Sequence, residues 1–169
     1  MSDLTEAGFD QAEVAELAKQ EPDFLAAMAM PEVFEYCWPP IFLAVWAWLR
    51  EHVDLDRAFQ LLALGLPRGF GKTTVIKLFI LYCVIFTNRK FILIMSATAT
   101  LAENIISDVA DMLDERNIKE VFGDWQLGLE KDTNAVKKFG FKGRNIIIAG
   151  LGAGGSVREI GRASCRERV

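Results

Sequence analysis

A glycine-rich turn between two apolar runs is the feature of this sequence that most restricts its fold. The turn is Gly65-Leu-Pro-Arg-Gly-Phe-Gly-Lys-Thr-Thr74, and it joins the apolar run 59–66 to the nearly all-apolar stretch 73–86. A short continuous apolar run that ends in turn residues predicts a strand covered on both faces. The longer stretch predicts a helix buried against a sheet, because it is apolar nearly all round.

The rest of the chain extends this pattern. Apolar spacing and helix-forming residues predict helices over 10–20, 22–30 and 40–51, ahead of the turn. After it, a buried strand is expected over 91–95, a helix capped by 96–100, and a strand over 145–149. Alternating strands and helices predict an α/β domain with a mainly parallel sheet flanked by helices. We therefore expect a helical N-terminal region, 1–56, followed by a partial nucleotide-binding domain, 57–158.

Composition narrows the functional classes. The 169-residue chain is 51% apolar, which suits one globular domain with a substantial core. Its net charge of −4 gives no overall basic field, so a contact with DNA would need a local patch or another domain. The three cysteines, at 37, 83 and 165, have no paired spacing and predict reduced thiols in a cytosolic protein. No secretory signal or membrane-spanning stretch is recognisable.

The last eleven residues, 159–169, show neither an amphipathic periodicity nor a pattern of residues typical of turns. Residues 160–169 look like the conceptual translation of a short-read sequencing adapter. We therefore expect this segment not to be native, and the coding sequence to have been cut after Arg158.

The turn itself has the residues of a phosphate-binding loop. Gly69 and Gly71 allow a backbone path that brings main-chain N–H groups close to an anion at a helix N-terminus. Lys72 would supply a cation to the β- and γ-phosphates of ATP, and the hydroxyl of Thr73 is placed to ligate Mg²⁺. Leu66 stands where the pattern G-x-x-x-x-G-K-[ST] has its first glycine. Because the phosphate cradle consists of Gly69, Phe70, Gly71, Lys72, Thr73 and Thr74, this departure costs little.

Three segments resemble one protein family. Leu66-Pro-Arg-Gly-Phe-Gly-Lys-Thr-Thr74 is similar to the deviant phosphate-binding loop of large terminase subunits, the ATP-driven motors that package DNA into viral capsids. The strand and loop 91–98, followed by an acidic helix, resemble that family's second strand. The segment 146–158 resembles a strand, glycines and arginine that precede the family's acidic metal-binding strand. The resemblance covers residues 57–158.

The resemblance implies roles for particular residues. Lys72 and Thr73 would hold nucleotide and metal, Arg68 would sense or stabilise the γ-phosphate, and Arg158 would act on a neighbouring subunit's ATP. The glycine expected after Arg158 is replaced by Glu159. The implied partners are double-stranded DNA, a portal protein, the small terminase subunit and further copies in a ring. The implied location is the cytoplasm of a bacteriophage's host, with transient docking at the procapsid portal.

The sequence lacks the acidic strand end and catalytic glutamate that ATP hydrolysis requires, and also the nuclease domain of terminases. We expect this fragment to bind nucleotide poorly and to hydrolyse it barely. Alternatives are another ATPase such as a helicase, suggested by Ser96-Ala-Thr98, or a small-molecule kinase. A GTPase is disfavoured, since Thr87-Asn-Arg-Lys90 is not a guanine-reading motif. A non-catalytic scaffold that docks on a capsid partner is the alternative from another class.

Overall fold

The computed structural model describes residues 10–32, 38–53, 63, 65 and 67–154. The chain divides into two compact units, and each is presented by itself. Unit 1 combines residues up to 87 with residues 112–124, and unit 2 combines residues 88–111 with those from 125 onward. The predicted strand 59–66 lies outside the described residues except for Ala63 and Gly65, as do the expected boundary at 56/57 and the tail 159–169.

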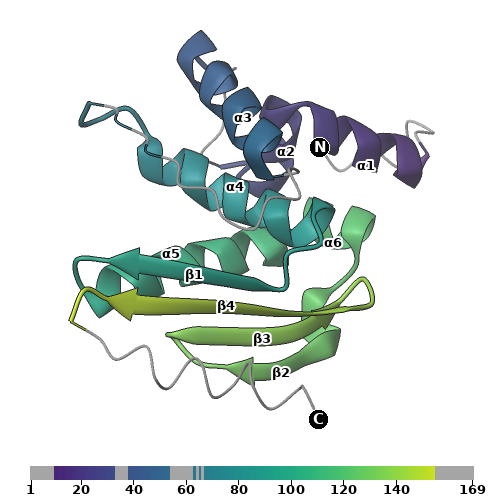
Figure 1. Ribbon diagram of the computed structural model, residues 1–169. Coiled ribbons are helices and arrows are strands. Elements are labelled where there is room, and N and C mark those ends of the chain that lie inside the picture. Colours follow the sequence, from purple (N-terminus) through teal and green to yellow (C-terminus); the bar gives the residue numbers. More distant parts are fainter. Residues whose placement is uncertain (1–9, 33–37, 54–62, 64, 66, 155–169) are drawn as a thin grey trace. The chain divides into compact units, whose positions relative to one another are not determined.

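Unit 1 is helical (Figure 1). Its helices are α1 (Gln11–Gln20), α2 (Pro22–Ala29), α3 (Pro40–Val53), α4 (Lys72–Phe86) and α6 (Arg116–Phe122), with the last residues of α5. The predictions over 10–20, 22–30, 40–51 and 72–86 are confirmed, and α6 was not predicted. Asp10 caps α1 by accepting a hydrogen bond from the Ala12 backbone N–H, and Pro22 occupies the first position of α2.

Aromatic rings hold unit 1 together. The ring of Trp46, on α3, is 2% exposed and meets Phe79 and Tyr82 of α4 edge-on, with ring centroids 5.8 and 5.5 Å apart. Trp38 packs on Trp46 at 6.0 Å, and Phe86 of α4 packs on Phe122 of α6 at 5.4 Å. Edge-to-face pairs at these separations add stability beyond the area that they bury. The aromatic residues of the N-terminal helices that the structure describes therefore include core packing groups.

Unit 2 is a four-stranded sheet with one long helix (Figure 1). Its elements are β1 (Phe91–Ser96), α5 (Ala99–Asp114, which ends in unit 1), the short 3₁₀ helix η1 (Trp125–Gly128), β2 (Leu129–Asp132), β3 (Val136–Phe141) and β4 (Arg144–Gly152). The strands lie in the order β1-β4-β3-β2. The predicted strands 91–95 and 145–149 and the helix between them are confirmed, whereas η1, β2 and β3 were not predicted.

The expected fold class, a nucleotide-binding domain with a mainly parallel sheet, is wrong. Only β1 and β4 pair in parallel, and β4 with β3 and β3 with β2 are antiparallel. The cause is the turn Lys142-Gly143, whose φ angles of 49° and 73° are both positive. A two-residue turn of this kind joins adjacent antiparallel strands. The glycine pattern over 139–144 indicates only a turn and does not reveal that β3 leads into it.

Helix α5 packs closely on β4 through glycines. A Cβ added at Gly150 would lie 2.9 Å from the Cδ1 of Ile106, and one at Gly152 would lie 2.6 Å from the backbone N of Ala99. These two glycines let the helix and the strand approach each other. Thr98 caps the helix, since its hydroxyl accepts a hydrogen bond from the Leu101 N–H at 3.3 Å. Within the described ranges, no helix combines the length and apolar character needed to cross a bilayer.

Candidate functional site

The glycine turn meets α4 with left-handed backbone angles at two glycines. Gly69 and Gly71 have φ angles of 84° and 60°, and Gly71 is the N-cap of α4 in the left-handed region. Side chains disfavour both angles, so glycine is required at each position. The predicted pair of permissive glycines is therefore used as expected, directly before the helix that Lys72 begins.

The amino end of α4 presents main-chain donors. Gly71 has no side chain to cap the helix, and the first helical hydrogen bond runs from the Val75 N–H to the Gly71 carbonyl at 3.1 Å. In the part of the chain that the structure describes, the N–H groups of Thr73 and Thr74 donate to no protein acceptor. The first turn of a helix carries partial positive charge together with such donors. The loop is therefore suited to an anion with several oxygens.

The side chains of the loop add to this character. The Nζ of Lys72 donates to the Pro67 carbonyl at 2.6 Å, so the ammonium folds over the loop instead of extending into solvent. Arg68 and Thr73 are exposed, and Phe70 is 44% exposed. All six residues predicted to hold the phosphates, 69–74, thus occupy one turn and its helix start. Arg158, the remaining predicted site residue, lies outside the described residues.

Helix α3 packs against the loop at Gly71. A Cβ added at Gly71 would lie 3.5 Å from the ring of Phe42, which is in turn packed edge-on against Trp38 at 5.5 Å. The loop thereby rests on the aromatic core of unit 1. Nothing in the local sequence around Phe42 relates it to the loop.

The loop offers fewer protein ligands to Mg²⁺ than to phosphate. Thr73 offers one hydroxyl at the start of α4. Across the described residues, no group of three or more His, Cys, Asp or Glu side chains could hold a metal ion. A magnesium ion at this loop would therefore take most of its oxygen ligands from the nucleotide and from water, as is usual for this ion.

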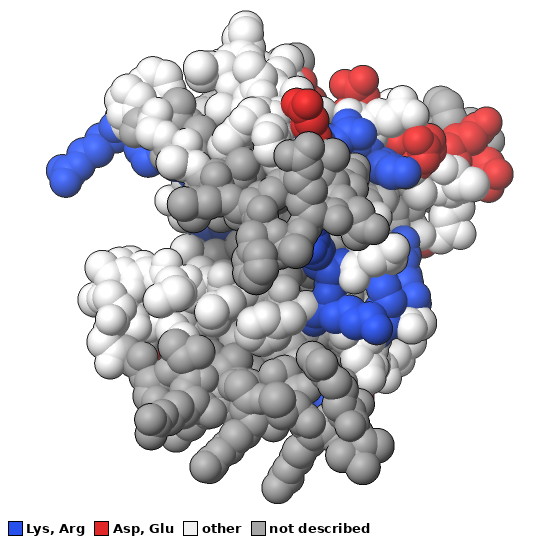
Figure 2. Space-filling view, viewed as in Figure 1, with Lys and Arg blue, Asp and Glu red and all other residues white. Residues whose placement is uncertain are grey.

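Unit 2 carries a basic cluster at the end of its sheet, made of Arg89, Lys90, Lys142 and Arg144. Arg89 and Lys90 precede β1, and the Lys90 carbonyl accepts from the Ile147 N–H of β4 at 2.8 Å. Lys142 lies in the turn before Arg144, and β3 and β4 meet there through the pair Phe141–Arg144. Lys and Arg side chains gather over this end of the sheet in Figure 2. These residues form a local basic patch on a chain whose net charge is −4.

Electrostatics in the basic cluster are those of crowded cations. Partial burial lowers the pKa of Lys142, and the nearby positive charge of Arg144 lowers it further. Partial burial also lowers the pKa of Arg144. The charged form of Lys142 is thus disfavoured first by burial and then by the charge of Arg144.

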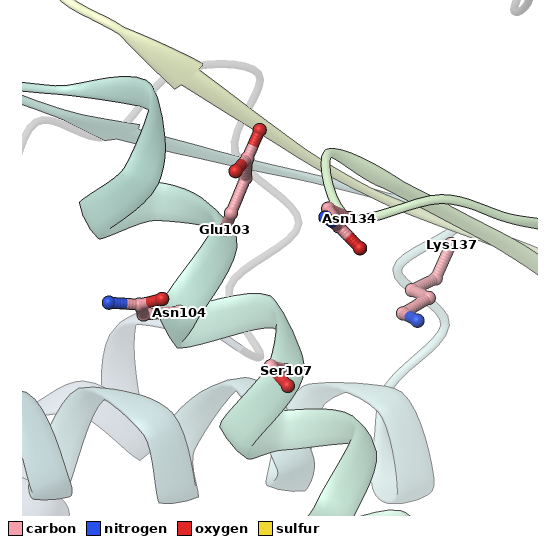
Figure 3. Close-up of a pocket in the computed structure, with 5 residues that line it drawn as sticks. All are labelled: Glu103, Asn104, Ser107, Asn134 and Lys137. Atoms are coloured by element: carbon pink, nitrogen blue, oxygen red, sulfur yellow. The ribbon is translucent and has the colours of Figure 1, made fainter.

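Unit 2 also has a polar pocket that no local sequence pattern predicts (Figure 3). Its volume is about 190 Å³, and it is lined by Glu103, Asn104 and Ser107 of α5 and by Asn134 and Lys137 of the β2–β3 hairpin. The two groups of residues are some 30 positions apart, and β3 was not predicted. No local signal could therefore have brought them together.

No protein-family model, curated protein or solved structure matches this chain.

Proposed function

We propose that this chain binds ATP through residues 69–74 and is the ATP-binding part of a DNA-packaging motor of the terminase type. The observation that carries the proposal is the loop geometry: two glycines with positive φ bring Lys72 and the N–H groups of α4 to one point. The proposal depends on this loop and not on the arrangement of the sheet, because the cradle is formed by local backbone.

In this proposal the main-chain amides and Lys72 hold the β- and γ-phosphates. Lys72 would exchange its bond with the Pro67 carbonyl for phosphate oxygens, which are stronger acceptors because they are charged. Thr73 would contribute its hydroxyl to a bound magnesium ion, which neutralises phosphate charge. Arg68, exposed within the loop, would lie against the γ-phosphate and stabilise charge that develops as the terminal bond breaks. Arg158 would reach the nucleotide of a neighbouring subunit.

The DNA-directed part of the proposal is supported by the basic cluster. Arg89, Lys90, Lys142 and Arg144 offer cations at one end of a sheet, on a chain whose net charge is −4. A concentrated patch on an otherwise acidic chain favours a polyanionic partner at that place alone. We assign the contact with the backbone of double-stranded DNA to this cluster. The portal protein, the small terminase subunit and the ring of further copies stay proposals from resemblance, as does work in the host cytoplasm.

The proposal is tested by nucleotide binding to the whole chain. Titration of a fluorescent ATP analogue with Mg²⁺, followed by competition with ATP, should reveal binding that Lys72→Ala weakens at least about tenfold, since it removes a charged hydrogen-bond donor. Thr73→Ala should weaken only the magnesium-dependent part. Lys90→Ala, the same substitution in the basic cluster, is the matched control and should leave ATP binding unchanged.

Two results would contradict the nucleotide proposal. Equal weakening by Lys72→Ala and Lys90→Ala would mean that ATP is bound merely as a polyanion. No binding at millimolar ATP, and no thermal stabilisation by ATP with Mg²⁺, would favour the alternative of a non-catalytic scaffold that docks on a capsid partner.

The DNA contact has its own prediction. Anisotropy of a labelled DNA duplex should show binding that weakens steeply with salt, because cations displace condensed counterions from the duplex. The double variant Arg89→Ala/Lys90→Ala should weaken binding and lower the salt slope by about 2, one for each phosphate that is no longer neutralised. Lys72→Ala should leave this slope unchanged. A slope that is the same in the double variant would put the DNA contact elsewhere.

A further inference from the structure

The polar pocket of unit 2 combines a defined volume with polar residues from two elements. In Figure 3, Glu103 and Ser107 lie on the side of α5 nearer the hairpin that carries Asn134 and Lys137, and the amide of Asn104 points away from that hairpin. Among the described residues, the side chains of Glu103, Ser107 and Asn134 take part in no hydrogen bond or ion pair. The pocket thus presents a carboxylate, a hydroxyl and amide groups whose bonding capacity is open to a ligand.

The walls of the pocket are fixed by the backbone. The turn that carries Asn134 is closed by hydrogen bonds between Thr133 and Val136 at 2.9 and 3.3 Å, and the Gly150 N–H of β4 donates to the Ala135 carbonyl at 2.8 Å. The opposite wall, α5, is held at close range by Gly150 and Gly152. Preformed walls reduce the ordering cost of binding a small molecule.

The charged side chains that line the pocket determine whether it favours a cationic or an anionic ligand. Lys137 is 15% exposed at its side chain and forms an ion pair with Asp132, so its charge is balanced within the hairpin. The carboxylate of Glu103 has no such partner among the described residues. The uncompensated charge is therefore negative and favours a cationic group beside Glu103.

The uncharged side chains that line the pocket favour a ligand with hydrogen-bonding groups. Asn104, Ser107 and Asn134 can each donate and accept hydrogen bonds, and none of the described residues that line the pocket is aromatic or aliphatic. We propose that this pocket binds a small primary amine that also carries several hydroxyl groups. The protonated amine would donate to Glu103, and the hydroxyl groups would meet Ser107 and the amide of Asn134. This site is separate from the phosphate-binding loop and does not depend on ATP binding.

A divalent cation fits the pocket less well. Among the described lining residues Glu103 carries the one carboxylate, and Lys137 lines the same space. Magnesium and calcium sites need several oxygen ligands and exclude a neighbouring cation.

The probe is D-glucosamine, with D-glucose as its matched control, because the two differ by an amino group in place of one hydroxyl. Isothermal titration calorimetry and ligand-observed NMR on the whole chain should show glucosamine binding at least about tenfold more tightly than glucose, since a charged hydrogen bond is gained. Glu103→Gln keeps the size of the side chain and should remove this preference. Asp111→Asn, an exposed substitution on the same helix outside the pocket, should preserve it.

Each other outcome would overturn the assignment. Equal binding of the two sugars, or no binding of glucosamine, would mean that no amine is recognised. An unchanged preference in Glu103→Gln would put the amine elsewhere. Binding of Mg²⁺ or Ca²⁺ alone that Glu103→Gln abolishes would identify a metal site instead.

Discussion

Replacing Phe139 with alanine is expected to destabilise unit 2 by about 3–5 kcal/mol, the usual cost of removing a fully buried phenyl ring. Phe139 is 0% exposed, and its ring centroid lies 4.9 Å from that of Trp125 and 6.4 Å from that of Phe141. The cost has two parts, the apolar surface that is no longer buried and an unfilled cavity between β3 and η1. It is a large share of the stability of a small domain, which is about 5–15 kcal/mol.

Hydrogen exchange of the β3 and β4 amides, together with urea denaturation, would measure this effect. Leu127→Ala is the control, because Leu127 is 89% exposed and its truncation should change stability by less than about 0.5 kcal/mol. A destabilisation below about 1 kcal/mol for Phe139→Ala would contradict the packing described for unit 2, given the cost of cavities of this size.

The second large effect is expected at Gly128, in η1. A Cβ built there would lie 2.0 Å from the carbonyl oxygen of Gly140 and 2.8 Å from its carbonyl carbon. Both atoms belong to the backbone of β3, which cannot move aside without disturbing its two neighbouring strands. Gly128→Ala should therefore cost about 3 kcal/mol, at the upper end of ordinary overpacking.

Gly140 provides the matched comparison, since it is the other member of the same contact. A Cβ added at Gly140 meets nothing nearer than 3.8 Å, and its φ lies outside the left-handed region. Gly140→Ala should thus stay within about 0.5 kcal/mol of the parent chain. Both variants add one methyl group to the same contact and differ only in whether that methyl points at the neighbouring backbone. Hydrogen exchange and urea denaturation would measure both. Equal effects would show that η1 does not lie against β3 at this distance.

The stability variants and the nucleotide-binding variant should act independently. Phe139 and Gly128 lie in unit 2, whereas Lys72 lies in unit 1. Lys72→Ala should weaken ATP binding at least about tenfold without lowering the protection of β3 and β4 amides. Mutations at distant sites that share no partner usually have additive effects.

Local signals were sufficient for several elements. Helix α2 begins at Pro22, the first residue of the predicted range 22–30, because proline suits the first position of a helix. The start of α4 at Lys72 follows from Gly71, whose left-handed backbone ends the loop. The turn at Gly69 and Gly71 could be predicted for the same reason, since positive φ angles are a local property of glycine.

The hairpin β2–β3 carries no such signal. Leu129–Asp132 and Val136–Phe141 are rich in charged residues, which are uncommon in strands taken by themselves. They are stabilised across the sheet by the ion pairs Lys138–Glu130 and Lys137–Asp132 and by ladder bonds with β4. Such partners are distant in sequence or depend on register, so inspection of either segment alone does not reveal them.

The helices α1 to α5, the two apolar strands β1 and β4, and the glycine turn before α4 could all be read from the residues, because each depends on interactions within a few positions. The antiparallel insertion of β3 beside β4 could not. That insertion set Asn134 and Lys137 opposite α5 and gathered four cations at one end of the sheet. Strand pairing and pocket formation depend on contacts between segments far apart in the chain, and a local pattern of residues does not specify which segment will be its partner.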